Sequence, residues 1–139
     1  MEISLVGAGY WGSKLKAELE TIPGVEEIEI IDIKNGKDLK DIKYDNVILA
    51  TPAWDHHTQT IRLLQQDKNV YVEKPLAIDK KGLNAIRDTY QEVNKKSNCA
   101  HLMVGFNRRF SPHIIKMKEL ISKVTEPKSI VMTMNAGSI

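Results

Sequence analysis

The sequence has little of what several classes of protein require. Its single cysteine, Cys99, rules out an intrachain disulfide and a cysteine-based metal site, and we expect it to pack as a small apolar side chain. No apolar run reaches the roughly 18 residues that a membrane span needs. Met1 leads directly into an apolar segment that lacks the basic region and cleavage site of a signal peptide. We therefore expect a cytoplasmic protein with no membrane partner.

Histidine is scarce too, with four residues in the chain. His56 and His57 adjoin each other, but no carboxylate or cysteine stands at the spacing of a metal-ligand set, so no metal site is predicted. His101 falls in a predicted strand and His113 in the first turn of a predicted helix, where we expect structural roles.

The chain also lacks an excess of one charge. Twenty Lys and Arg residues stand against 18 Asp and Glu, a formal net charge of +2, and the basic residues are scattered among acidic ones. A nucleic-acid-binding protein would gather positive charge on one face or arm, so no nucleic-acid partner is predicted. With 42% hydrophobic and 27% charged residues, the 139-residue chain has the composition of one folded domain.

Short β-branched runs alternate with longer segments of helical periodicity, and the connections between them are short. Strands are predicted at 3–6, 26–33, 47–50, 70–72, 100–104 and 129–134. Helices are predicted from the first glycine-rich turn to Pro23, at 55–66, from Asp79 onward and from Ser111-Pro112 to about 124, whereas 37–44 is too short and too charged for one. This alternation predicts an α/β fold with a doubly wound parallel sheet.

Apolar spacing predicts which helix faces are buried. The first helix is expected to bury Leu15, Leu19 and Ile22. The helix after Asp79, with Asp79 as its N-cap, is expected to bury a longer stripe: Leu83, Ile86, Tyr90 and Val93.

The first motif, G-x-G-x-x-G, follows the first strand and opens a helix. Gly7 permits a tight turn, Gly9 lets the backbone approach a pyrophosphate, and Gly12 lets the helix pack closely on the strand. Phosphates would lie at the helix N-terminus, where free N–H groups favour negative charge. From their place in this loop, Tyr10 and Trp11 are also expected to contact the cofactor.

Asp32 lies twenty residues after Gly12, where the second strand ends. A carboxylate there accepts hydrogen bonds from the hydroxyls of an adenosine ribose and repels a 2′-phosphate. The predicted cofactor is therefore NAD rather than NADP.

Three further polar segments also follow predicted strands. They begin at Ala50-Thr51-Pro52, at Glu73-Lys74-Pro75 and at Gly105. The carboxyl ends of parallel strands meet at one edge of the sheet, where open α/β sheets bind their ligands. Methyltransferases also combine a glycine-rich loop with an acidic strand end, but these three segments argue against that class.

In this order, the motifs GAGYWG, ATPAWDH, EKP and GFNRRF make the chain resemble the N-terminal domain of the Gfo/Idh/MocA oxidoreductases (glucose-fructose oxidoreductase, inositol dehydrogenase and rhizopine-catabolism proteins). The resemblance covers roughly residues 1–125 and implies a Rossmann domain. It implies hydride transfer between a nicotinamide cofactor and a sugar, cyclitol or nucleotide-sugar alcohol.

The resemblance also implies roles for particular residues. Lys74 would lie at the nicotinamide and Glu73 at its ribose. The remaining positions expected to line the cofactor or to lie near the nicotinamide are Ile33, Ala50, Thr51, Pro52, His56, Asn107 and Arg108.

Oxidation of an alcohol needs a proton acceptor for the hydroxyl and a positive group beside the developing alkoxide. A lysine offers both, so Lys74 is the predicted catalytic residue. Arg108 and Arg109 are adjacent and point in different directions; we favour Arg108 as the one near the substrate.

The chain departs from the family pattern after the Rossmann domain. Relatives carry a second α+β domain that supplies the substrate pocket, and only its first strand would be present here, so we expect domains at 1–125 and 126–139. A homo-oligomer would form through the missing domain. The alternative to a dehydrogenase domain is a stand-alone, non-catalytic dinucleotide-binding or redox-sensing module.

Overall fold

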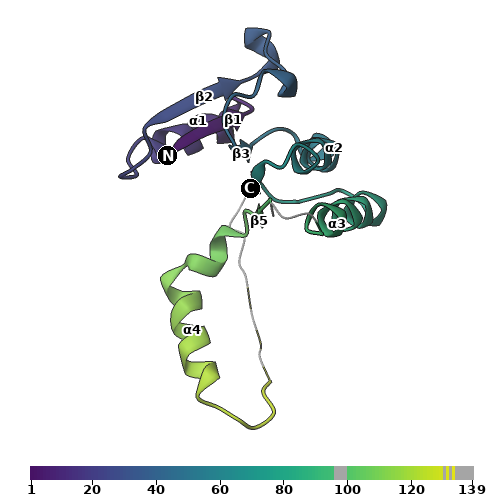
Figure 1. The fold of residues 1–139 in the computed structure, drawn as a ribbon. Helices are drawn as coiled ribbons and strands as arrows, with labels where there is room; N and C mark the ends of the chain where they lie inside the picture. The colour runs from purple at the N-terminus through teal and green to yellow at the C-terminus, as the bar shows by residue number, and fades with distance from the viewer. Residues whose placement is uncertain (96–99, 130, 132, 134–139) are drawn as a thin grey trace. The chain divides into compact units, whose positions relative to one another are not determined.

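The computed structural model describes residues 1–95, 100–129, 131 and 133, apart from the side chain of Ile33. Figure 1 shows the course of the chain. The elements are β1 (Glu2–Val6), α1 (Tyr10–Leu19), β2 (Glu27–Ile31), η1 (Ile33–Asn35), η2 (Leu39–Asp41), β3 (Asn46–Leu49), α2 (Ala53–Leu64), β4 (Asn69–Val72), α3 (Lys80–Val93), β5 (Leu102–Val104), η3 (Asn107–Phe110) and α4 (Pro112–Ser122).

The five strands form one parallel sheet in the order β2-β1-β3-β4-β5. The order reverses between β1 and β3, because the chain goes from β1 outward to β2 and then returns to the other side of β1. In a sheet of this kind, the crevice at the reversal is where ligands bind. The short connection expected between β2 and β3 is confirmed, since it contains only the single 3₁₀ turns η1 and η2.

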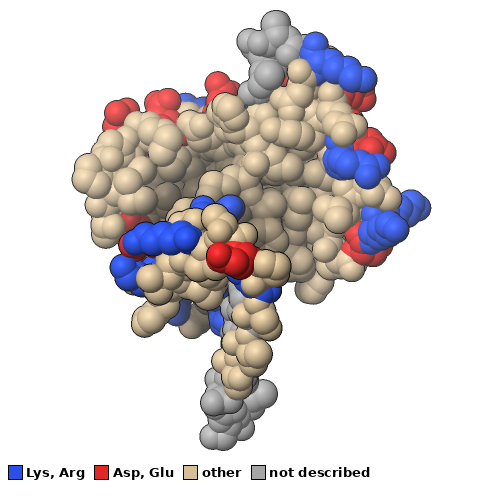
Figure 2. All heavy atoms as spheres, turned by 90° about the horizontal axis from the view of Figure 1, so that it is seen from below, with Lys and Arg blue, Asp and Glu red and all other residues tan. Residues whose placement is uncertain are grey.

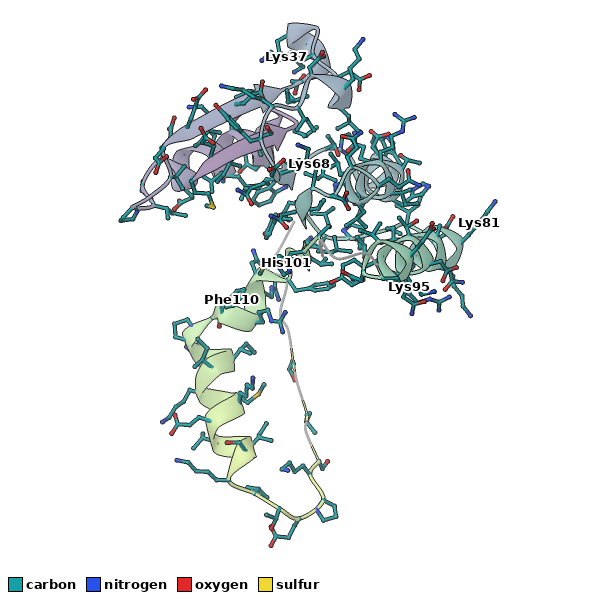
Figure 3. All side chains as sticks on the ribbon, viewed as in Figure 1. Lys37, Lys68, Lys81, Lys95, His101 and Phe110 are labelled. Carbon is teal, nitrogen blue, oxygen red and sulfur yellow. The ribbon has the colours of Figure 1, made fainter. Side chains whose placement is uncertain are left out.

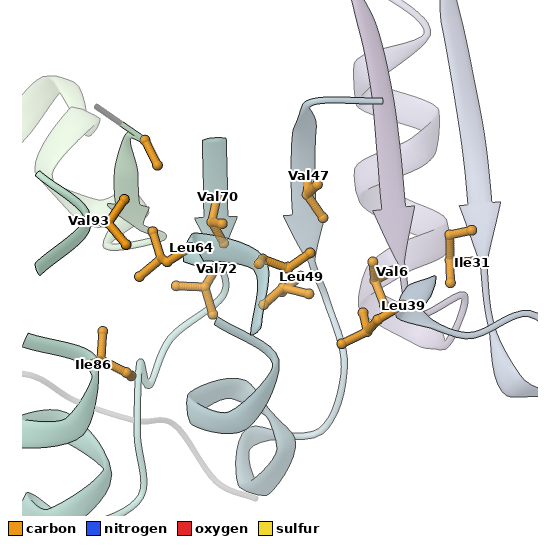
Figure 4. Packing of buried hydrophobic residues seen from close by; sticks show 12 residues of the cluster. Val6, Ile31, Leu39, Val47, Leu49, Leu64, Val70, Val72, Ile86 and Val93 are labelled. Atoms are coloured by element: carbon orange, nitrogen blue, oxygen red, sulfur yellow. The ribbon is translucent and has the colours of Figure 1, made fainter. Parts of the chain in front are cut away.

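Helices cover both faces of the sheet, which confirms the doubly wound α/β fold. Successive side chains of a strand point to opposite faces. One face packs on α2 and α3 through the cluster drawn in Figure 4, whose labelled members are Val6, Ile31, Leu39, Val47, Leu49, Leu64, Val70, Val72, Ile86 and Val93.

The opposite face meets α1, whose Leu15 and Leu19 border a hollow of about 510 Å³. Where this hollow extends over β3, β4 and β5, it is lined by Ile48, Tyr71 and Met103. Tyr71 is partly buried and Met103 is 43% exposed.

Two predictions about buried helix faces are wrong. Ile22 is exposed because α1 ends at Leu19 and the chain turns before reaching it. Leu83 is 48% exposed, and its neighbour Gly82 is buried instead. A side chain at Gly82 would come within 3.1 Å of the His57 ring, so the glycine lets α3 approach α2 and turns Leu83 outward.

Two helix starts are placed as expected, those after Asp79 and Ser111, whereas the helix predicted at 55–66 is α2 and begins at Ala53. Asp79 is the N-cap of α3 and accepts a hydrogen bond from the Gly82 N–H at 2.7 Å. Ser111 is the N-cap of α4, with Pro112 in the first turn.

Contacts along the chain define two compact units, Met1–Phe106 and a second that starts at Asn107. The second contains η3 and α4, which contact each other. The strand predicted at 129–134, in the domain expected from 126 onward, falls largely outside the described residues, as does Cys99.

Charges of both signs share the surface. On the face shown in Figure 2, Lys and Arg side chains are scattered among Asp and Glu side chains. Several form exposed ion pairs, such as Lys116 with Glu119 at 2.8 Å. No helix in the described part of the chain is long and apolar enough to cross a membrane.

Candidate functional site

The loops that follow β1, β3, β4 and β5 begin at the same edge of the sheet. In each case the first residue after the strand donates its backbone N–H, at 2.8 or 2.9 Å, to the last residue of a neighbouring strand: Gly7 to Ile31, Ala50 to Val6, Glu73 to Leu49 and Gly105 to Val72. The motifs at Gly7, Ala50, Glu73 and Gly105 are therefore brought together along one edge, as the sequence predicts.

The three glycines of the first motif differ in what surrounds them. Gly7 has φ +94°, and a Cβ there would lie 2.8 Å from the carbonyl oxygen of Ala50. A Cβ on Gly12 would overlap the carbonyl oxygen of Gly7, whereas a Cβ on Gly9 would meet nothing within 4 Å. Gly7 and Gly12 are thus required by the chain's own packing, and Gly9 borders open space.

That open space adjoins the N-terminus of α1. The N-cap is Gly9, which has no side chain to accept a hydrogen bond from the first turn. The N–H groups of this turn and the helix dipole together favour an anionic group there. The local structure therefore suits a phosphate in front of α1.

Asp32 stands beside the same turn. Its carboxylate accepts hydrogen bonds from the backbone N–H of Ala8 at 2.6 Å and from that of Lys34 at 2.8 Å. The bond from Ala8, followed by the bond from Lys34, lowers the pKa of Asp32 below its ordinary value, against the opposing effect of burial. Asp32 is therefore a carboxylate at neutral pH and braces the glycine-rich turn.

These features border one pocket of about 570 Å³ at the reversal between β1 and β3. The predicted site residues that line it are Gly7, Gly9, Tyr10, Trp11, Asp32, Ala50, Thr51 and Pro52. Tyr10 and Trp11 are largely exposed, with their ring centroids 5.3 Å apart in an edge-to-face arrangement.

The pocket also contains residues that the prediction missed. Trp54 and Gln59 come from α2, and the Gln59 amide oxygen accepts a hydrogen bond from the Thr51 hydroxyl at 2.6 Å. Lys37 lies in the connection between β2 and β3 (Figure 3), and its ammonium group is 3.2 Å from the Glu29 carboxylate. Asp55 also lines the pocket and lies four residues before Gln59 on α2, so the sequence spacing alone places these two side chains on one face of the helix.

His56, which we expected to line the cofactor, is 1% exposed and is not part of the pocket lining. Its contact with the cofactor stays a prediction. Its Nδ1 lies 2.7 Å from the carbonyl oxygen of Pro75, and its Nε2 lies 2.8 Å from that of Thr51. Because both ring nitrogens are engaged by backbone, His56 ties the loop after β3 to the loop after β4.

The other predicted residues lie outside the pocket lining. Glu73 and Lys74 follow β4, two strands along the edge from β1. Asn107 and Arg108 belong to η3 in the second unit, so their place near the nicotinamide stays a prediction. The side chain of Ile33 is outside the described part of the chain.

A parallel α/β sheet with a glycine-rich turn, an uncapped helix N-terminus and a strand-end aspartate around one pocket defines a dinucleotide-binding domain. Residues 13–106 match the sequence profile of the Gfo/Idh/MocA group, described as "Oxidoreductase family, NAD-binding Rossmann fold". The chain belongs to this family, which confirms the resemblance, and it carries the family's NAD-binding Rossmann domain.

Individual relatives agree with this assignment. A 4-carboxy-2-hydroxymuconate-6-semialdehyde dehydrogenase of Sphingobium is 35% identical over 131 residues, covering 81% of this chain and 40% of the relative. An inositol 2-dehydrogenase of Rhizobium meliloti is 29% identical over 119 residues, covering 84% of this chain and 34% of the relative. The chain thus spans less than half the length of these relatives.

Solved structures share the fold. An NAD-binding protein from Listeria innocua superimposes with a TM-score of 0.69 at 28% identity, over 89% of this chain and 40% of the other. A scyllo-inositol dehydrogenase from Lactobacillus casei, solved with NAD(H) and scyllo-inositol, gives a TM-score of 0.68 at 23% identity, over 88% and 41%.

Proposed function

We propose that this chain is the NAD-binding part of a dehydrogenase acting on a sugar, cyclitol or nucleotide-sugar alcohol. The observation that carries the proposal is the 570 Å³ pocket in which open space at Gly9 adjoins both the uncapped start of α1 and the Asp32 carboxylate. The names of the inositol dehydrogenases among the relatives support the substrate class. Membership of an oxidoreductase family does not favour the alternative of a non-catalytic sensing module.

The pocket fits the adenosine half of NAD. Phosphates would lie at the N-terminus of α1 beside Gly9, and the adenosine ribose would donate its hydroxyls to Asp32. From there the nicotinamide half would extend along the sheet edge toward β4, where Glu73 would receive the hydroxyls of its ribose. When bound, NAD supplies the hydride acceptor of the reaction.

Preference for NAD over NADP is the first test, and it depends on the charge of Asp32. We expect NADH to bind at least about tenfold more tightly than NADPH, because a 2′-phosphate beside a carboxylate is repelled. Lys34 and Lys37 line the same pocket. In Asp32→Ala the 2′-phosphate of NADPH would meet their ammonium groups without an opposing carboxylate, so the difference in affinity between NADH and NADPH should narrow.

Both tryptophans of the chain, Trp11 and Trp54, line this pocket, so their fluorescence reports its occupation. Titration of wild type with NADH and NADPH gives the two dissociation constants. Asp32→Asn is the matched control, since it removes the charge but keeps an oxygen that can accept from Ala8 or Lys34. Equal or tighter binding of NADPH by wild type would refute the proposed cofactor preference.

Turnover is the second test. The 139-residue chain is expected to bind NADH without measurable oxidation of sugars or inositols. The alcohol carbon must be held against the nicotinamide, and this orientation supplies much of the rate. Holding it there needs residues on the other side of the substrate, which a second domain would provide. Joined to a C-terminal domain of the length that the relatives have, it should turn over. Lys74 would then take the hydroxyl proton and, once protonated, stabilise the alkoxide form.

In such a longer protein, Lys74→Ala should lower kcat by about 100-fold or more while changing the NADH dissociation constant little. Asn107 and Arg108 are proposed to lie near the substrate, so their alanine variants should raise KM. Steady-state kinetics and NADH titration separate these effects. Robust oxidation by the 139-residue chain alone would show that the substrate site has been misplaced.

A further inference from the structure

Tyr71 and Glu73 stand two residues apart at the carboxyl end of β4, so their side chains share one face of the sheet. The Tyr71 hydroxyl donates a hydrogen bond to Oε1 of Glu73 at 3.1 Å. Tyr71 lines the hollow over β3, β4 and β5, and its hydroxyl reaches the carboxylate of Glu73, the first residue after β4. The phenol therefore spans from the apolar face of the sheet to the carboxylate.

The protonation of this pair is set by its surroundings. Burial, followed by the charge of Glu73 and the hydrogen bond to it, raises the pKa of Tyr71 to about 12. At neutral pH the phenol keeps its proton and is the donor. Oε1 of Glu73 is the acceptor, which leaves Oε2 as the oxygen that would receive a ribose hydroxyl.

Gly105 provides the space for this contact. Val104, the last residue of β5, pairs with Val72, the last residue of β4. The next residues, Gly105 and Glu73, are therefore neighbours at the edge of the sheet. A Cβ on Gly105 would lie 2.6 Å from the Tyr71 hydroxyl oxygen, 3.0 Å from its ring carbon Cζ and 3.1 Å from Oε1 of Glu73. A side chain at this position would therefore make the hydroxyl end of Tyr71 shift and would press on Oε1 of Glu73.

We infer that Tyr71 is a positioning residue that orients the Glu73 carboxylate toward the cofactor, and that Gly105 leaves the room in which the two groups meet. The inference rests on the proposed function, in which Glu73 binds the ribose on the nicotinamide side. Tyr71 and Gly105 are not among the predicted site residues. Tyr71 lies inside a predicted strand, and Gly105 comes before the Asn107-Arg108 pair to which the prediction was confined. Their contact joins β4 to the loop after β5.

The experiment compares two probes by tryptophan fluorescence. ADP reaches the glycine-rich turn and Asp32, whereas NADH also reaches Glu73. In Tyr71→Phe, which removes one oxygen atom, we expect the NADH dissociation constant to rise roughly threefold to tenfold and the ADP constant to stay within about twofold of wild type. Gly105→Ala should show the same pattern.

Tyr44→Phe is the matched control. Tyr44 precedes β3 at the opposite end of the strands, and its hydroxyl accepts a hydrogen bond from Lys43 at 2.8 Å. This variant also loses one partly buried phenolic hydroxyl, but it should bind both probes as wild type does. Urea unfolding of each variant shows how far a general loss of stability contributes.

The decisive variant is the double change. In a Glu73→Ala background, Tyr71→Phe should have no further effect on NADH binding, because the hydroxyl then has no carboxylate to orient. The inference is overturned if Tyr71→Phe binds NADH as wild type does, if it weakens ADP equally, or if its effect persists without Glu73. Failure of wild type to bind either probe would instead refute the proposed function, and the inference with it.

Discussion

A Gly9→Val variant is expected to fold like wild type and to lose dinucleotide binding. A Cβ at Gly9 meets nothing within 4 Å, and its φ of −71° is open to any residue, so the chain itself accommodates the side chain. The isopropyl group would occupy the space in front of α1 where the phosphates are proposed to lie. We expect the dissociation constants of NADH and ADP both to rise by about a hundredfold or more.

Fluorescence titration measures the binding loss, and thermal unfolding checks the fold. A valine N-cap is less favourable than glycine, so a decrease in stability of about 1 kcal/mol or less is expected. Gly9→Ala, with one methyl group, should give an intermediate loss of affinity. If Gly9→Val bound NADH as tightly as wild type, the phosphate site would lie elsewhere.

Gly12→Ala is expected to behave differently from Gly9→Ala, although the two glycines are only three residues apart. It should cause a large loss of stability. A Cβ at Gly12 would overlap the carbonyl oxygen of Gly7, which is a backbone atom and cannot move aside as the end of a flexible side chain could. In an unobstructed helix the change to alanine would stabilise by about 1 kcal/mol, so the clash must outweigh that gain. We expect a net loss of about 2 kcal/mol or more in the free energy of unfolding.

Urea unfolding of Gly9→Ala and Gly12→Ala forms a matched pair within one turn. Gly9→Ala should lose affinity and, as a poorer N-cap, lower the unfolding midpoint only slightly. Gly12→Ala should lower the unfolding midpoint much more. A Gly12→Ala protein with wild-type stability would mean that α1 can move away from β1 without cost, which would contradict the close packing of the two.

Much of the site could be predicted because it depends on chain order alone. Gly7 and Asp32 each follow an apolar strand, and parallel strands place their carboxyl ends at one edge. The ladder of hydrogen bonds from Gly7, Ala50 and Glu73 to the neighbouring strands confirms that edge. The requirement for glycine at position 12 follows from the same local turn, because a Cβ there would overlap the carbonyl oxygen of Gly7.

Contacts between distant segments could not be predicted in this way. His56 is at the expected position on α2, but a helix start offers several directions for a side chain. Its buried contacts with the carbonyls of Thr51 and Pro75 depend on how the loops after β3 and β4 close. Likewise, Gly82 rather than Leu83 faces inward because α3 approaches the His57 ring.

The sequence by itself determined the order of strands and helices along the chain and the residues of the glycine-rich turn, because these depend on local periodicity. It also determined the edge at which the motifs meet, because crossovers between parallel strands have one geometry. Only the tertiary structure decided that Tyr71 reaches Glu73 and that Gly105 must leave room for both. Spacing along the chain places Tyr71 and Glu73 on one face, but their hydrogen bond depends on the rotamers of both side chains. The approach of Gly105 depends on the register between β4 and β5, which the spacing does not encode.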